Sequence, residues 1–363
     1  MNKIPYPDNW YDIDTTLYNR SVKIIGTVKK MLSVKLKLHA DTQVQQGDIF
    51  LFNHFSRFET FIPQFLIFEE TGDYCCAIAA GEFFKEDTVL ARYLKNVGVF
   101  PHDHDRLFPL LAAQVLRGRK VIIFPEGGMV KDHRVMDKQG RYSIYSRLTG
   151  QRRKQHTGAA VLAQGIEIFK DAIRKAYADK NQAQLLRWKE ALHFDSLDQL
   201  LTSALKPTLI IPSNITFYPI RSSENLLLTG VELFADNLSV RQTEELLIEG
   251  NIMLKNTDMD IRMGTPIGPH KVSNWWNRYL LERMTAKLNT LDDVFKLHTA
   301  PENWQQTYLG AYFKKRANAL RDRYMQEIYA NVTINLSHLA STLIMYCMEK
   351  GQQHIEHHDM RLR

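Results

Sequence analysis

The chain has 363 residues, 44% of them apolar, so it can bury a full core and is not a wholly disordered protein. Its net charge is +7, and its three cysteines give no disulfide framework, which favours a reducing compartment. No run of residues approaches the ~20 apolar positions that a membrane-spanning helix needs, and the first residues lack the apolar segment of a signal peptide.

The first predicted element is a basic amphipathic helix at the start of residues 15–40. This segment holds six Lys and Arg residues and no Asp or Glu, and its apolar residues recur at near-helical spacing. Such a helix can lie on an anionic membrane surface, or it can pack its apolar stripe on the domain with its lysines in water. Both interpretations stay open. We do not expect nucleic acid binding, because the segment lacks a recognisable motif and interleaved aromatic residues.

Strand and helix patterns then alternate along the chain. Short apolar or alternating runs predict strands at residues 34–38, 47–52, 73–79, 97–100, 120–124 and 209–217. Helical periodicity predicts helices at residues 107–116 and 158–177, and a helical insertion at about residues 178–206. This order predicts an α/β fold, with Cys75 and Cys76 as core residues of a strand rather than nucleophiles.

Helical patterns dominate the chain after a late strand expected near residues 260–264. They begin at Trp275, break near Pro301 and Asn331, and end with a helix at residues 334–350. We therefore divide the chain into an N-terminal helix with a lead-in strand (1–39), a central α/β domain (40–270) and a helical C-terminal extension (271–363).

The segment from Asn53 to Glu59 carries the first candidate for chemistry. It follows an apolar run, and His54 is followed five positions later by the carboxylate of Glu59. The unperturbed pKa of histidine, about 6.5, lies close to neutrality. A carboxylate on one ring nitrogen leaves the other free to take a proton, which is what a general base needs to activate a hydroxyl.

Ser56 and Glu59 also match a helix-capping box, in which Glu59 does no chemistry. Pro63 argues against that interpretation, because a helix capped by Ser56 would place this proline in the helix interior. A helix capped by Thr60 puts Pro63 in the first turn, where proline is tolerated. We therefore predict a helix start at Thr60 and a turn from His54 to Glu59, in which the two side chains can converge.

A second segment ends a buried-strand pattern with an acid and two glycines, Phe124-Pro125-Glu126-Gly127-Gly128. With the first segment, it makes the chain resemble the glycerolipid acyltransferase superfamily, the glycerol-3-phosphate and lysophosphatidate acyltransferases. That family carries N-H-x-x-x-x-D/E, a G-x-x-F strand, F-P-E-G, and a strand ending in P-V or P-x-x-I. Residues 98–101 and 210–215 supply the weaker two segments, and residues 156–160 resemble the small-residue helix start that follows F-P-E-G. The resemblance covers roughly residues 40–270.

The resemblance implies a mixed central sheet flanked by helices. It implies acyl transfer from acyl-CoA or acyl-carrier protein to a hydroxyl of glycerol-3-phosphate or lysophosphatidate, in phospholipid synthesis by a cytoplasmic protein on the inner face of a membrane. His54 would be the general base, oriented by Glu59, with no covalent enzyme intermediate, cofactor or metal. Acceptor binding would fall to residues near the motifs: Asn53, Arg106, Glu126, Gly127, Gly128 and Lys131.

The chain departs from the family at two basic positions. Met129-Val130-Lys131 stands where the family has an arginine after F-P-E-G, and His102 to Asp105 separate the Gly98 strand from Arg106. Arg106 and Lys131 are the nearest replacements for the arginines that hold a phosphate.

Other interpretations remain open. A hydrolase could use the His54–Glu59 pair to activate water, an inactive relative could bind lipid without turnover, and a plain partner-binding domain is a third alternative. The run from His102 to Asp105 could ligate a metal, or it could be an ordinary polar loop at a strand end. The resemblance places substrate contacts here and so implies the rim of a pocket. Gly127-Gly128 is also compatible with a simple tight turn.

Overall fold

Short and almost uninterrupted apolar runs form the centre of the sheet, as expected for strands buried on both faces. These are β2 (Ile49–Phe52), β5 (Lys120–Ile123) and β3 (Cys75–Ala79), and every residue of β2 is fully buried. The computed structural model describes residues 12–31, 35–40, 43–54, 62–84, 87–126, 143–145, 152–154, 156–218, 258–269, 272, 274–334 and 336–350.

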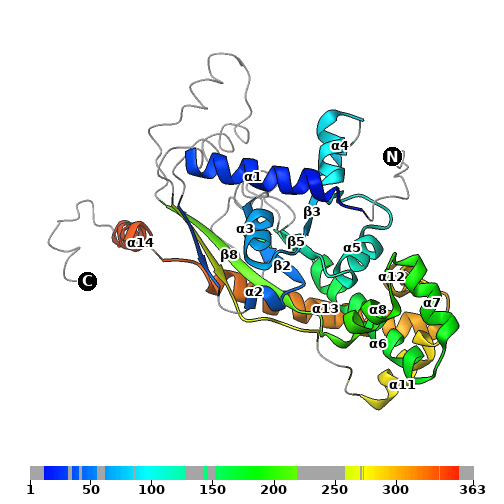
Figure 1. The fold of residues 1–363 in the computed structure, drawn as a ribbon. Coiled ribbons are helices and arrows are strands. Elements are labelled where there is room, and N and C mark those ends of the chain that lie inside the picture. Colours follow the sequence, from blue (N-terminus) through cyan, green and yellow to red (C-terminus); the bar gives the residue numbers. More distant parts are fainter. Residues whose placement is uncertain are drawn as a thin grey trace.

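The sheet is mixed, as the resemblance implied (Figure 1). Its outer strands are β4 (Val99–Pro101), β8 (Ile210–Tyr218), β9 (Asp258–Met263) and β1 (Lys35–His39). Within the described residues, seven strands lie in the order β1-β9-β8-β2-β5-β3-β4. Neighbours are parallel except β8 and β9, which run antiparallel. Two further strands, β6 (Ser143–Tyr145) and β7 (Arg152–Lys154), form a separate antiparallel pair.

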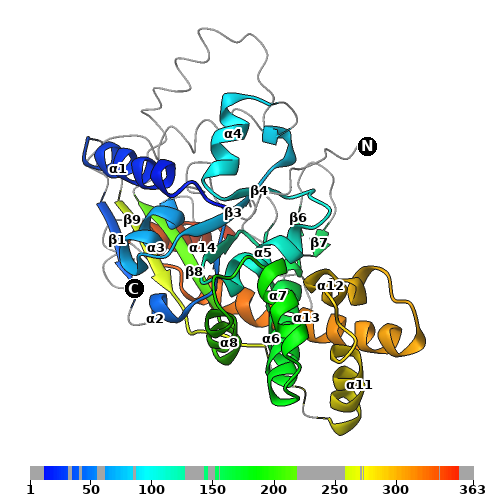
Figure 2. The same ribbon diagram turned by 45° about the vertical axis from the view of Figure 1, so that its right-hand side comes forward.

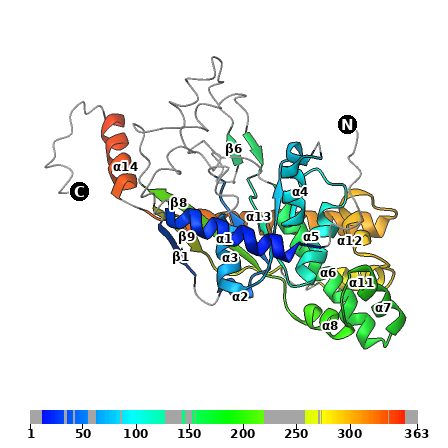
Figure 3. The ribbon, with the colours of Figure 1, turned by 45° about the horizontal axis from the view of Figure 1, so that its top comes forward.

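One face of the sheet is covered by α1 (Thr15–Met31), α2 (Gln43–Gln46) and α3 (Ile62–Thr71). The ring of Tyr18 in α1 is buried beside Phe68 and Tyr74, so the helix packs part of its apolar stripe on the domain. Figure 3 shows α1 lying across this side of the sheet, above α3. The basic helix therefore packs on the domain, as one of the two interpretations expected. Contact of its exposed face with a membrane stays a proposal.

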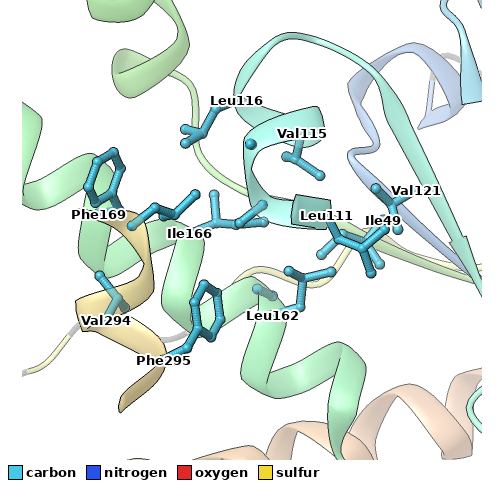
Figure 4. Close-up of a cluster of buried hydrophobic side chains, with 14 of the residues drawn as sticks. Ile49, Leu111, Val115, Leu116, Val121, Leu162, Ile166, Phe169, Val294 and Phe295 are labelled. Atoms are coloured by element: carbon cyan, nitrogen blue, oxygen red, sulfur yellow. The ribbon is translucent and has the colours of Figure 1, made fainter. Parts of the chain in front are cut away.

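The opposite face carries a larger helical layer (Figure 2). Its helices are α5 (Leu107–Leu116), α6 (Gly158–Ala178), α7 (Gln182–Ala191), α8 (Leu197–Leu205), α11 (Trp275–Thr285), α12 (Leu291–Thr299) and α13 (Trp304–Ala330). Figure 4 shows Phe295 of α12 beside Leu162 of α6, in the same buried cluster as Leu111 of α5 and Ile49 of β2. The helices α11, α12 and α13 therefore share one hydrophobic core with the central sheet.

The remaining elements lie at the margins: the 3-10 helix η2 (Gly81–Phe84), α4 (Val89–Asn96) and α14 (Leu336–Glu349). The last helix, α14, exposes large apolar side chains, among them Leu336, Met345 and Met348. Among the helices that the structure describes, none combines the length and the apolar character needed to cross a bilayer.

Most elements expected from the sequence are confirmed within one or two residues. The helix at residues 107–116 has those bounds, and the helical insertion divides into α7 and α8. The breaks near Pro301 and Asn331 separate α12, α13 and α14. Pro63 lies in the first described turn of α3, as its conformational preference requires, whereas the predicted cap at Thr60 lies outside the described residues. The short elements α2, η2, α4, β6 and β7 were not predicted.

Candidate active site

The two candidate motifs meet because β2 and β5 are parallel neighbours. Ile49 to Leu51 pair with Val121 to Ile123, so both strands end at the same edge of the sheet. His54 follows β2, and Glu126 follows β5. Ligands of open α/β sheets bind beyond the carboxyl ends of the strands, so this edge is where a site is expected.

Asn53 continues the sheet with its side chain. Its Nδ2 donates to the Ile215 carbonyl at 3.0 Å, and its Oδ1 accepts from the Ile215 N–H at 2.7 Å. Backbone pairing between β2 and β8 ends one residue earlier, at Phe52 and Ser213. The amide thus imitates one more step of the strand pairing and fixes the backbone that leads into His54.

Glu126 reaches across from β5 to the histidine turn. It is 1% exposed, and its Oε2 accepts from the backbone N–H of His54 at 2.7 Å. Its Oε1 accepts from the hydroxyl of Tyr329 at 2.5 Å. A buried carboxylate is tolerated only when it is hydrogen-bonded, and this one joins two motifs that are distant in sequence.

The ring of His54 packs on the ring of Phe124, with 4.9 Å between centroids and 41° between planes. Phe124 itself packs near Phe52, at 6.3 Å. His54 is partly buried, and the Phe124 ring contacts one side of its imidazole. This contact limits the orientations that the imidazole can adopt.

The long helix α13 packs against the segments that follow β5 at this edge of the sheet. The buried hydroxyl of Tyr324 donates to the His156 carbonyl at 2.9 Å, and the His156 N–H donates to the Pro125 carbonyl at 3.2 Å. Through His156, helix α13 is therefore connected both to the turn after β5 and to the start of α6. Sequence reasoning missed Tyr324 and Tyr329, because tyrosines on the apolar face of a helix are typical core residues.

Arg106, proposed as a phosphate ligand, stands at the start of α5 beyond β4. Its guanidinium binds the carboxylate of Asp292 through two hydrogen bonds, Nε to Oδ1 at 2.7 Å and Nη2 to Oδ2 at 2.9 Å. β5 and β3 lie between β2 and β4 in the sheet. An acceptor phosphate would have to compete with Asp292 for this cation.

Four other predicted site residues lie outside the described residues. They are Glu59, Gly127, Gly128 and Lys131. The predicted pairing of His54 with Glu59 therefore remains a prediction.

The run from His102 to Asp105 forms the turn between β4 and α5. His102 Nδ1 accepts from the Gly81 N–H at 3.0 Å, and His104 Nδ1 accepts from the Arg106 N–H at 2.9 Å. Burial holds the pKa of His104 below its usual value. Within the described part of the chain, no three His, Cys, Asp or Glu side chains are grouped as a metal site requires.

Cys75 and Cys76 are fully buried in β3, as expected from the sequence. Desolvation raises the pKa of the Cys76 thiol to about 12 and raises that of Cys75 further. Both thiols are therefore core groups rather than nucleophiles.

Neither a family model nor a curated protein sequence matches the chain. Its structure is similar to that of the 1-acyl-sn-glycerophosphate (LPA) acyltransferase PlsC from Thermotoga maritima. The match covers 79% of this chain and 83% of that chain, with 13% sequence identity and a TM-score of 0.32.

Proposed function

We propose that the protein is an O-acyltransferase that moves a fatty acyl group from acyl-CoA or acyl-carrier protein to a hydroxyl of glycerol-3-phosphate or lysophosphatidate. The observation that carries the proposal is the hydrogen bond from the His54 N–H to the Glu126 carboxylate. It joins the two motifs whose residue types and order resemble those of glycerolipid acyltransferases, at the edge of the sheet where strands deliver catalytic groups.

The proposed reaction begins when the imidazole of His54 takes the proton from the acceptor hydroxyl. The hydroxyl oxygen attacks the thioester carbonyl and forms a tetrahedral oxyanion. Collapse of this intermediate forms the ester and expels the thiolate, which takes the proton back from the imidazolium. His54 thus ends the cycle neutral, and no covalent enzyme intermediate forms.

Glu59 is proposed to orient His54 and to stabilise its charged form, as a carboxylate does for a catalytic imidazole. Arg106 and Lys131 are proposed to bind the acceptor phosphate, with Asn53, Gly127 and Gly128 shaping the acceptor site. The donor is already activated as a thioester, so the proposed chemistry needs no further cofactor.

The test is incubation of the purified chain with labelled acyl-CoA or acyl-carrier protein and a panel of glycerol phosphates, lysophosphatidate and unphosphorylated glycerols. We expect label in an ester product. Label released only as free fatty acid would instead indicate a hydrolase that uses the same histidine.

His54→Ala should lower turnover by about 10²–10⁴, the usual span for loss of a general base, with little change in donor affinity. His39→Ala is the matched control, because His39 also lies beside a carboxylate, Asp260, at 3.3 Å, but on the edge strand β1. Wild-type turnover in a folded His54→Ala protein would rule out this base assignment.

A further inference from the structure

The carboxylate of Glu126 is the point at which three distant segments meet. Glu126 itself follows β5. Its carboxylate accepts one hydrogen bond from the backbone N–H of His54, which follows β2, and another from the hydroxyl of Tyr329 near the end of α13. The two contacts measure 2.7 Å from the His54 N–H and 2.5 Å from the Tyr329 hydroxyl, so one side chain joins all three segments.

The end of α13 is held in a fixed position relative to the sheet. The side-chain amide of Asn214 in β8 donates to the Ile328 carbonyl at 2.9 Å. Beyond the helix, the N–H of Thr333 donates to Oγ1 of Thr216 at 3.1 Å. Tyr324 and Ile328 are fully buried. The hydroxyl of Tyr329 is therefore presented to Glu126 by a helix that β8 anchors next to it.

We infer that Glu126 and Tyr329 are positioning residues that hold His54 at the strand edge. The Tyr329 hydroxyl holds one carboxylate oxygen of Glu126, and the other oxygen then faces the His54 N–H. This inference rests on the proposed function, in which His54 is the base. Glu126 then contributes to catalysis by positioning His54 rather than by contacting the acceptor. Helix α13, which carries Tyr329, becomes part of the proposed active site.

Charge and burial support this assignment over direct acceptor contact. The proposed acceptors are anionic, and a carboxylate facing a phosphate would repel it. Glu126 is 1% exposed, and both of its oxygens have protein donors. A backbone N–H is a group that any non-proline residue at position 54 would present, so this contact orients the main chain at His54 and not its side chain.

The test compares Tyr329→Phe, Glu126→Gln and the double variant with wild-type protein. Each single change should lower kcat roughly tenfold, the scale of one hydrogen bond to a charged group, and leave the KM of donor and acceptor within about twofold. The double variant should lose little more than Glu126→Gln, because both changes break the same chain of contacts. Tyr312→Phe is the matched control, since its hydroxyl bonds Arg316 on the same helix.

A rise in acceptor KM with unchanged kcat in Glu126→Gln would overturn the inference, because it would show direct acceptor binding. Wild-type kinetics in Tyr329→Phe would overturn it as well. Failure of the proposed function is seen separately: in that case His54→Ala retains activity, or no acyl product forms in the wild type.

A second measurement does not depend on activity. In protein labelled with ¹⁵N-histidine, the His54 backbone amide is identified by its loss in His54→Ala. Its exchange with solvent should become faster in Tyr329→Phe and in Glu126→Gln, and remain unchanged in Tyr312→Phe. Equal exchange in all variants would show that the Tyr329–Glu126 contact does not hold the His54 main chain, and the inference would fail.

Discussion

The double hydrogen bond between Arg106 and Asp292 makes the proposed phosphate contact testable at the level of single residues. Both side chains are partly exposed, so the pair contributes little to stability and variants should fold. Arg106→Ala should raise the acceptor KM roughly ten- to a hundredfold, with little effect on the donor KM. Lys131→Ala should act in the same direction, more weakly, because lysine lacks a bidentate fork.

Asp292→Asn should have the opposite effect on acceptor binding to Arg106→Ala. It removes the competing carboxylate and should lower the acceptor KM if the guanidinium binds phosphate. Steady-state kinetics with phosphorylated and unphosphorylated acceptors measures both effects. If neither Arg106 nor Lys131 alters acceptor KM, and an unphosphorylated acceptor works equally well, the glycerol-phosphate assignment is wrong.

The buried thiols of β3 give a prediction about reactivity. Burial raises the pKa of Cys76 to about 12 and that of Cys75 further, so almost no thiolate exists near neutral pH. Both residues should resist alkylation by iodoacetamide at pH 8 in the folded protein and react once it is unfolded in guanidinium. Peptide mass spectrometry locates the label, and rapid labelling of Cys75 or Cys76 in the native protein would contradict the packing of β3.

Gly310 determines how closely helices α12 and α13 can pack. A Cβ added at Gly310 would lie 2.5 Å from the backbone carbonyl oxygen of Leu297, which cannot rotate away. Gly310→Ala should therefore destabilise the protein by about 1–3 kcal/mol, the usual cost of overpacking, despite its better helix propensity.

Gly26→Ala in α1 is the control for helix propensity alone. A Cβ there would be 3.8 Å from the Phe65 ring, an ordinary contact, so this change should stabilise the protein by about 0.5–1 kcal/mol. Thermal and urea unfolding of the two variants measures the contrast. Equal stability changes would mean that the helices do not pack closely at Gly310.

Element prediction from the sequence succeeded where the physical signal was local. The apolar run of β2 and the helical periodicity of α6 are read directly from neighbouring residues, and Pro63 is suited to the first turn of α3 by its own ring. Short elements such as α2 and β6 lack enough residues for a period to appear, so tertiary contacts decide their structure.

Only the part of the candidate site that lies in sequence motifs could be predicted, because the rest depends on the complete fold. His54 and Glu126 stand in recognisable motifs, but Tyr329 belongs to a helix whose packing on β8 is set by the complete fold. Asp292 was missed for the same reason, since nothing near it in the sequence indicates that its partner is Arg106. Contacts between distant segments carry no local pattern.

Membrane contact is also a property of the whole molecule. α1 packs Tyr18 on the domain and leaves Arg20, Lys23 and Ile24 exposed. We expect the protein to co-sediment with anionic vesicles and to leave them as salt rises, since exposed charges are screened beyond ~8 Å at physiological ionic strength. Arg20→Glu with Lys23→Glu should weaken binding. Equal binding to neutral vesicles, or none to either kind, would count against a membrane-surface role for α1.

The pairing of β1 with β9, together with the reach of α13 to Glu126, has a consequence for biosynthesis. β1 is synthesised more than 200 residues before its only described strand partner, residues 258–263, and Tyr329 follows later still. At about 5–20 residues per second, the nascent chain carries an unpaired edge strand and an incomplete site for tens of seconds. Until residues 258–263 have been made, β1 exposes an unpaired edge that can pair wrongly, and slower translation prolongs this interval. Activity should arise only after Tyr329 has been synthesised and has reached Glu126.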